Sequence, residues 1–221
     1  MAQTAIPQPP ASAAPPDDGQ WTMPSKNFAS TRYSELDEIN AGNVNTLQVA
    51  FTFPTTVNRG QEGAPITVGG TLYIVTPYPN ILFALDLTRP GAPMKWKYEP
   101  KPLAAAQGVA CCDVVNRGPA YAEGKVLFNT LDNQVVAVDA ETGKEAWKTK
   151  VGDINKGESM TGAPFVAAGK VFVGNSGGEF GVRGWVKALD LESGEVAWTA
   201  YSTGPDAEVL IGPDFKPFYD Q

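Results

Sequence analysis

Short runs of alternating apolar and polar residues recur along the chain and predict β-strands. The clearest set lies between residues 119 and 151, where PAYAEG, KVLFNTL, QVVAVDA and EAWKTKV follow one another with DN and ETGK as turn residues between them. Short alternating segments bounded by Gly, Asn and Asp are typical of antiparallel strands joined by tight turns. The chain is therefore predicted to be all-β.

Three segments share one order of landmarks. In each, a proline stands five residues before a glycine that opens an apolar strand, an aspartate ends a later strand, and a tryptophan follows. These are Pro65, Gly70, Asp86 and Trp96, then Pro119, Gly124, Asp139 and Trp147, then Pro164, Gly169, Asp190 and Trp198. The alanines two residues before the aspartates are 53 and 51 residues apart. A period near 50 residues built from short strands indicates β-propeller blades.

The alternative is an ordinary β-sandwich with chance spacing, and the coincidence of three landmarks favours the propeller. Rings take about four to eight blades. Three blades and a piece cannot close a ring, so the chain is expected to be part of a larger propeller. Residues 31–53 end in one more alternating stretch, expected to supply an outer strand to a neighbouring or closing blade.

Residues 1–20 are rich in Pro and Ala and lack a basic segment followed by an apolar core, so no intact signal peptide is visible. We expect a flexible N-terminal arm over residues 1–20, which would fit the remnant of a removed leader. Residues 21–221 are then expected to form the incomplete propeller domain.

Composition limits the classes of partner and metal that the chain is expected to bind. The formal net charge is −7 and the 17 basic residues are scattered, which argues against nucleic acid and anionic membrane as partners and leaves room for a basic protein. No apolar run approaches the roughly 18 residues of a membrane span. The absence of histidine excludes the Ser-His-Asp triad, zincin sites and two-His iron sites. Any metal must be held by oxygen ligands, which select calcium-like cations and, by size, trivalent lanthanides.

Departures from the repeat are where site residues are expected. From proline to aspartate, blades one and two take 21 and 20 residues but blade three takes 26, and the excess lies in GNSGGEFGVRGW at 174–185. There a hydroxyl (Ser176), two bare backbone amides (Gly177 and Gly178) and a carboxylate (Glu179) stand together, as a ligand site would need. A long solvated hairpin is the alternative.

The lead-ins, defined as the residues just before each blade's proline (58–64, 107–118 and 158–163), hold the other candidates. Cys111 and Cys112 are adjacent, and because a crosslink between neighbours closes no useful loop, stability is not their purpose. Arg117 follows and offers a guanidinium fork to an anion, unless it is a plain surface residue. Glu62 and Thr161 each stand three residues before a blade proline, which predicts that they point at one central location from successive blades. Turn residues that cap local backbone are the alternative for both.

These motifs resemble the pyrroloquinoline quinone (PQQ)-dependent alcohol dehydrogenases, and specifically their methanol dehydrogenase branch. The resemblance rests on GVACCDVVNRG, NSGGEFGVRGW, QEGAP, TGPDAEVLIG and the Trp-bearing VDAETGKEAW repeat, and it spans residues 20–221. That family is an eight-bladed quinoprotein propeller, and this chain matches its N-terminal part.

The resemblance implies a role for each candidate. Cys111 and Cys112 would form a vicinal disulfide against one face of the quinone, and Glu179 would be a carboxylate ligand of a lanthanide(III) or Ca(II) ion. The Gly177–Gly178 pair before it is similar to the lanthanide branch. Polar contacts to PQQ would come from Glu62, Arg117, Thr161, Ser176, Gly177 and Gly178. The family's catalytic base and remaining metal ligands match no position up to Gln221, so no catalytic residue is expected in this chain and the isolated fragment is predicted to be inactive.

The implied function is oxidation of methanol or another small primary alcohol in the periplasm, with electrons passed to a cytochrome c and with a homodimeric full-length protein. Two other classes stay open at this point: a non-catalytic propeller scaffold or binding module, and a cofactor- or metal-binding fragment without chemistry. A scaffold requires neither the cysteine pair nor Arg117 nor the Glu179 loop, so these residues discriminate against it.

Overall fold

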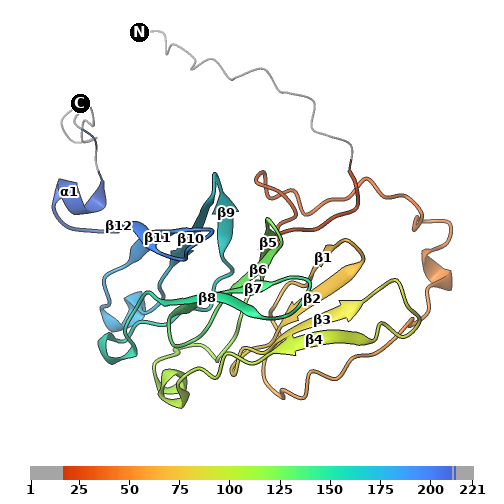
Figure 1. Cartoon of the computed structure of the whole chain (residues 1–221), viewed down its shortest axis with the longest axis horizontal. Coiled ribbons are helices and arrows are strands. Elements are labelled where there is room, and N and C mark those ends of the chain that lie inside the picture. Colours follow the sequence, from red (N-terminus) through yellow and green to blue (C-terminus); the bar gives the residue numbers. More distant parts are fainter. Residues whose placement is uncertain (1–16, 211, 213–221) are drawn as a thin grey trace, which may run out of the picture.

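The computed structural model describes residues 17–210 and residue 212, so residues 1–16 of the expected arm lie outside the described part. Three four-stranded antiparallel sheets follow one another along the chain as blades one to three (Figure 1). Their strands are β1 (Ile66–Val68), β2 (Thr71–Val75), β3 (Leu82–Asp86) and β4 (Met94–Tyr98); β5 (Ala120–Ala122), β6 (Lys125–Asn129), β7 (Gln134–Asp139) and β8 (Glu145–Lys150); and β9 (Phe165–Ala167), β10 (Lys170–Gly174), β11 (Trp185–Asp190) and β12 (Val196–Tyr201). The predicted all-β, partial-propeller fold is confirmed.

The remaining elements are short. They are the 3-10 turns η1 (Val44–Thr46), η2 (Ala104–Gly108), η3 (Ile154–Lys156) and η4 (Gly178–Phe180), and the single helical turn α1 (Asp206–Val209). Within the described ranges, none of the helices has the length and apolar character needed to cross a membrane.

Strand register explains why the landmarks recur. In each blade the alanine before the aspartate pairs with the tryptophan of the next strand, and a β-bulge follows it: Ala84 with Trp96, Ala137 with Trp147, and Ala188 with Trp198. Each aspartate then ends its strand and accepts hydrogen bonds from the following turn. Because these bonds favour the carboxylate form, they lower the pKa values of Asp86, Asp139 and Asp190, with Thr88, Thr142 and Ser193 as the respective main donors.

The tryptophan of one blade packs against the aspartate turn of the next. Trp147 of blade two donates its indole Nε1–H to the Leu191 carbonyl of blade three at 3.0 Å. Gly194 in that turn has φ +73°, and a Cβ there would lie 2.5 Å from the indole, so only glycine lets the ring approach. Trp96 repeats the arrangement against blade two.

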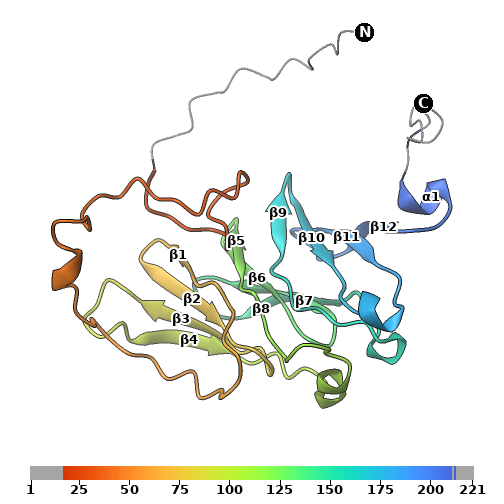
Figure 2. The ribbon, with the colours of Figure 1, turned by 180° about the vertical axis from the view of Figure 1, so that it is seen from behind.

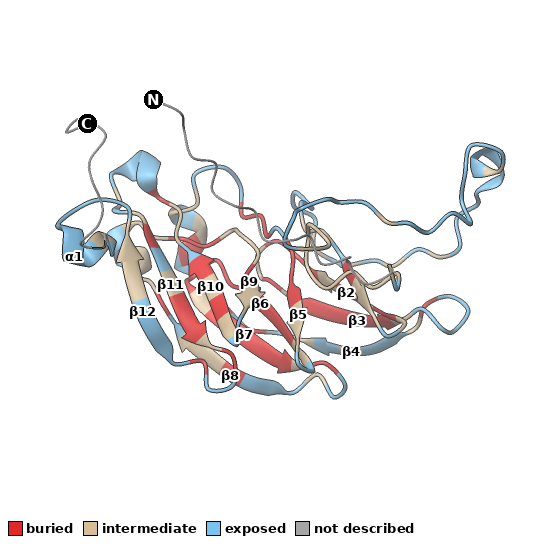
Figure 3. Cartoon of the chain, turned by 90° about the horizontal axis from the view of Figure 1, so that it is seen from above, coloured by how far each residue is buried: buried red, intermediate tan, exposed pale blue. Residues whose placement is uncertain are grey.

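Apolar side chains from neighbouring sheets fill the space between blades. Ile66, Leu82 and Phe128 belong to the cluster between blades one and two, while Leu127 and Leu189 belong to that between blades two and three. Burial is accordingly greatest in inner strands such as β3, β6 and β7, and falls toward the fourth strand of each sheet, β4, β8 and β12 (Figure 3).

The segment before blade one differs from expectation. Residues 47–53 are extended but form no ladder with any described strand, so the predicted strand is absent there. Phe51 and Phe53 pack against blade one instead, with the Phe53 and Phe83 rings 5.0 Å apart, while Leu47 and Val49 are exposed. Alternation predicts a half-buried strand, but a strand also needs a partner edge. Figure 2 shows this N-terminal segment running around blade one.

Candidate functional site

The three lead-ins meet through backbone hydrogen bonds. The Arg117 N–H donates to the Thr161 carbonyl at 2.9 Å, and the Ala64 N–H donates to the Arg117 carbonyl at 3.3 Å. Close approach of the chains is required here, because Gly118 has φ +119° and a Cβ on it would lie 2.6 Å from the Ala64 carbonyl oxygen. The lead-ins of all three blades therefore lie side by side.

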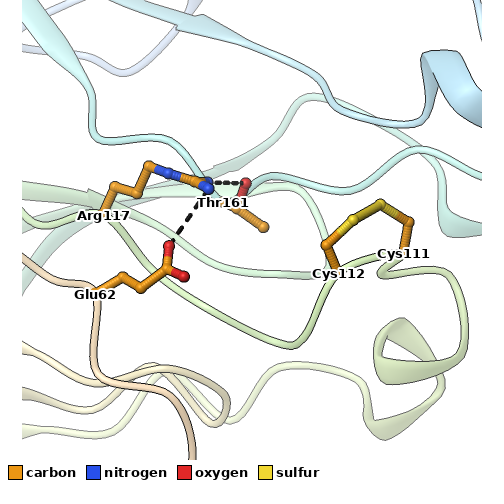
Figure 4. The surroundings of a disulfide bond; sticks show 5 residues. All are labelled: Glu62, Cys111, Cys112, Arg117 and Thr161. Carbon is orange, nitrogen blue, oxygen red and sulfur yellow. Dashed lines mark hydrogen bonds and ion pairs between the residues drawn. A yellow bond between two sulfur atoms is a disulfide. The ribbon is translucent and has the colours of Figure 1, made fainter.

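Arg117 joins two candidates from different blades. Its Nη1 donates to Thr161 Oγ1 at 2.7 Å, and its Nη2 lies 3.4 Å from Glu62 Oε2 (Figure 4). Glu62 and Thr161 thus point toward one location from blades one and three, with Arg117 of blade two between them. About half of the Arg117 and Glu62 side chains is exposed. An ion pair this exposed adds little to stability, so the cluster remains available to a ligand.

A disulfide joins Cys111 and Cys112, the only two cysteines of the chain. The bridge is exposed, while its segment is anchored by buried Val114, whose carbonyl accepts from the Tyr78 N–H at 2.8 Å. Figure 4 shows the bridge and the Arg117 cluster in one view, and both contribute to one pocket lining. The structure therefore presents a rigid apolar group beside a polar one.

A pocket of about 210 Å³ connects these groups. It is lined by Ala110, Cys111, Cys112, Asp113, Val115, Arg117, Ser159, Thr161, Ser176 and Glu179. Six of the nine predicted site residues are in this lining. Of the others, Glu62 reaches the pocket through Arg117, and Gly177 and Gly178 lie in the loop between Ser176 and Glu179.

The long loop of blade three, residues 174–185, is hydrogen-bonded to the lead-in of the same blade. Ser176 forms a β-bridge with Ser159, its N–H donating to the Ser159 carbonyl at 2.8 Å. Gly177 then adopts φ +118°, where a Cβ would lie 2.5 Å from the Gly157 carbonyl oxygen. The turn η4 follows and presents Glu179, which is exposed. This local geometry brings a hydroxyl and a carboxylate to the pocket.

Buried amides that the sequence reasoning missed hold the lead-ins in place. Asn116 accepts from the Gly118 N–H at 3.0 Å and donates to the Asn129 carbonyl at 2.8 Å, and Asn129 donates to the Gly162 carbonyl at 2.9 Å. Asn129 Oδ1 is buried and has no hydrogen-bond partner among the residues that the structure describes. These residues flank Arg117 and Thr161, so they orient the pocket without lining it.

Ser159, Asp113, Ala110 and Val115 also line the pocket and were not predicted. Ser159 could have been found, since it stands two residues before Thr161 and alternation would place both side chains on one face. Asp113 carries no comparable signal beyond its place after the cysteines.

The described part of the chain does not hold a complete metal site by itself. Among the described residues, no group of three or more Cys, Asp or Glu side chains is placed to hold an ion. The pocket offers carboxylates from Glu179 and Asp113. A complete coordination shell would need ligands beyond those described.

The chain belongs to the family described as PQQ: Glucose/ethanol/alcohol dehydrogenase, beta-propeller domain, whose model matches residues 21–210. The "Lanthanide-dependent methanol dehydrogenase" of Methylacidiphilum fumariolicum (strain SolV) is 54% identical over 205 residues, covering 93% of this chain and 34% of that protein. The "Methanol dehydrogenase [cytochrome c] subunit 1" of Methylorubrum extorquens (strain ATCC 14718 / DSM 1338 / JCM 2805 / NCIMB 9133 / AM1) is 47% identical over 213 residues, covering 92% and 34%.

A solved structure, "Europium-containing methanol dehydrogenase", superposes with a TM-score of 0.86 at 55% identity, covering 88% of this chain and 34% of that one. The chain spans about a third of the length of these relatives.

Proposed function

We propose that this chain provides one wall of the PQQ pocket of a methanol dehydrogenase, which oxidises methanol or a similar small primary alcohol. The observation that carries the proposal is the single pocket that brings together the vicinal disulfide, Arg117, Thr161, Ser176 and Glu179 from two blades. Family membership and the relatives' names support it. A scaffold role would leave this constellation without a purpose.

The side chains fit a flat, polyanionic quinone. Arg117 has guanidinium donors suited to a carboxylate, and the hydroxyls of Thr161 and Ser176 add neutral hydrogen bonds. The Cys111–Cys112 bridge offers an apolar surface to one face of a ring. Glu62 holds Arg117 in place from the other side and contributes a polar contact to the cofactor's edge, and the Gly177 and Gly178 backbone adds bare amides. The pocket is smaller than the roughly 300 Å³ of typical ligand sites, consistent with a second wall supplied from elsewhere.

We assign Glu179 as a carboxylate ligand of a lanthanide(III) ion, with Ca(II) as the runner-up. An oxygen-only donor set suits either cation, and the names of two relatives mention a lanthanide. When bound, the metal-polarised PQQ supplies the hydride acceptor for alcohol oxidation. This chain's residues bind and orient the cofactor, and we assign none of them as the catalytic base.

For the whole protein we propose a periplasmic location and a cytochrome c electron acceptor. The acceptor follows the name of the Methylorubrum relative, and the net charge of −7 suits a basic partner. A disulfide persists in oxidising compartments, which supports the periplasm. The homodimer implied by the family resemblance stays a prediction.

PQQ binding to the chain tests the proposal. Titration by absorbance and tryptophan fluorescence is expected to give saturable binding, which Arg117→Gln weakens about tenfold because a charge-assisted hydrogen bond is lost. Arg89→Gln is the matched control, since Arg89 is exposed in the turn after β3. Reduction of the Cys111–Cys112 bridge is expected to weaken binding as well. Equal affinity in the Arg117 and Arg89 variants would contradict the assignment.

Turnover gives a second readout. With PQQ, a lanthanide and methanol present, the isolated chain is expected to leave a dye acceptor oxidised, because we assign no catalytic base within it. Sustained dye reduction would show that the rest of the propeller is dispensable.

A further inference from the structure

A second and larger cavity lies between blades two and three. Its volume is about 620 Å³, within the roughly 300–1,000 Å³ of small-molecule sites. The end of β8, the η3 turn, the 181–183 segment, β11 and β12 contribute to its wall. We call it the basic cleft, after the cations in its lining: Lys150, Lys156, Arg183 and Lys187.

Three of these cations form no direct ion pair. Lys150, Lys156 and Lys187 make no ion pair with any carboxylate within 4.0 Å in the part of the chain that the structure describes. Arg183 is engaged, since it pairs with Glu208 at 2.6 Å and stacks 3.9 Å over the Tyr201 ring. A chain with a net charge of −7 thus concentrates positive charge in one concave place.

The two acids of the basic cleft are occupied by neutral donors. Glu158 accepts from the Trp185 indole at 3.0 Å and from the Asp153 N–H at 2.5 Å. Asp153 accepts from Asn155, whose backbone hydrogen bond is the main reason that the pKa of Asp153 is lowered. Both acids keep their charge and interact with the lysines through space, Asp153 with Lys150 and Lys156, and Glu158 with Lys187. They form no direct ion pair with these lysines within the described residues, and the lining still holds four cations against two acids.

Lys187 is the most buried of the three lysines. Its Nζ donates to the Val151 carbonyl and lies 4.4 Å from the Trp185 ring centroid. An ammonium group has three donors, so donors remain for a ligand. Burial lowers the pKa of Lys187, and the nearby Glu158 carboxylate offsets part of this effect. The ammonium charge is therefore incompletely solvated and would gain from a further anion.

The basic cleft and the pocket beside the Cys111–Cys112 bridge are lined by different parts of one loop. Ser176 and Glu179 line the pocket, whereas Gly181, Val182 and Arg183 line the cleft. The two linings have no residue in common, so a ligand of the cleft would be additional to the proposed cofactor.

We propose that the basic cleft binds a small multivalent oxyanion, either a polycarboxylate or a phosphate. Exposed Lys150 and Lys156 supply charge at the rim, and the more buried Lys187 supplies donors at depth. Several converging cations favour a multivalent anion over chloride, because each added charge pair increases the attraction.

Citrate and inorganic phosphate are the probes, titrated into the chain at constant ionic strength with sodium chloride as the reference. The readout is the indole N–H resonance of Trp185, which lines the cleft, with the enclosed Trp147 indole as the internal reference. Saturable shifts of Trp185 with citrate or phosphate, but not with chloride, are expected. The better probe distinguishes a carboxylate from a phosphate ligand.

Variants locate the site. Lys187→Gln is expected to weaken binding of the better probe about tenfold, and the exposed Lys156→Gln is expected to weaken it several-fold. Lys144→Gln, which removes one exposed positive charge in the β7–β8 turn, should leave affinity unchanged. Equal losses in all three variants would mean diffuse attraction and overturn the proposal. So would a Trp185 resonance that responds to chloride as it does to citrate.

Discussion

Trp147 and Trp198 occupy the same position in successive blades but have different surroundings. Both pair with the alanine of the preceding strand, at Ala137 and Ala188. Trp147 is 9% exposed and packs on the Gly194 turn, whereas Trp198 is 39% exposed and its described neighbours include no such turn. The difference teaches that a blade sets the register of its own tryptophan, while burial of that tryptophan depends on the next blade.

Replacing the two tryptophans separates these contributions. Trp147→Ala is expected to lower the free energy of unfolding by about 3–5 kcal/mol, because it leaves a cavity between blades. Trp198→Ala should cost about 1 kcal/mol, the value of its exposed aromatic pair with Phe172. Urea denaturation of both variants measures the difference. Equal losses would mean that register within the blade, rather than packing across blades, provides the stability.

The glycine beneath Trp147 offers a second test. Gly194→Ala is expected to cost about 2–4 kcal/mol, since a positive φ and a close indole both oppose a Cβ. Gly124→Ala is the matched control: Gly124 has φ +77° but nothing within 4 Å of the added Cβ, so it should cost about 1–2 kcal/mol. Thermal unfolding followed by tryptophan fluorescence compares them, and identical losses would leave no role for the indole.

The smallest effect concerns the aspartate of the same turn. Backbone hydrogen bonding from Ser193, then the Lys170 ammonium, lower the pKa of Asp190 from 3.8 to about 2. A carboxyl group whose pKa is lower in the folded than in the unfolded state stabilises the fold at pH values above its unfolded-state pKa, and this stabilisation is lost as the pH falls. The contribution of Asp190 is therefore present above about pH 4 and fades toward pH 2.

Asp190→Asn should therefore reduce the slope of the unfolding midpoint against pH between about 4 and 2. Asp37→Asn removes an exposed carboxylate before blade one and serves as the control. A slope that is the same in both variants would show that the turn does not depend on the Asp190 charge.

The repeat was predictable because its landmarks have local causes. Prolines, turn glycines, terminal aspartates and tryptophans recur at fixed spacing, and the structure confirms the sheets that they predict. The strand expected within residues 31–53 does not form among the described residues, because alternation reports which faces are apolar but not whether a partner edge is present. Its pairing with a further blade stays a prediction.

The site was predictable in composition but not in contacts. Departures from the repeat indicated Cys111, Arg117 and Glu179, yet no pattern could place Arg117 between Glu62 and Thr161. Buried amides such as Asn129 look like ordinary turn residues in sequence, and the lysines of the basic cleft are brought together only by the packing of blade two on blade three.

The close contact of Gly118 with the Ala64 carbonyl has a consequence for the shape of the assembly. At the lead-ins, beside the first strand of each sheet, neighbouring blades are separated by bare backbone, whereas at the fourth strand they are separated by a whole indole. Each blade pair is therefore a wedge whose angle depends on the difference between these two thicknesses. A side chain at position 118 would thicken the narrow end, flatten the wedge and increase the number of blades needed to complete a circle.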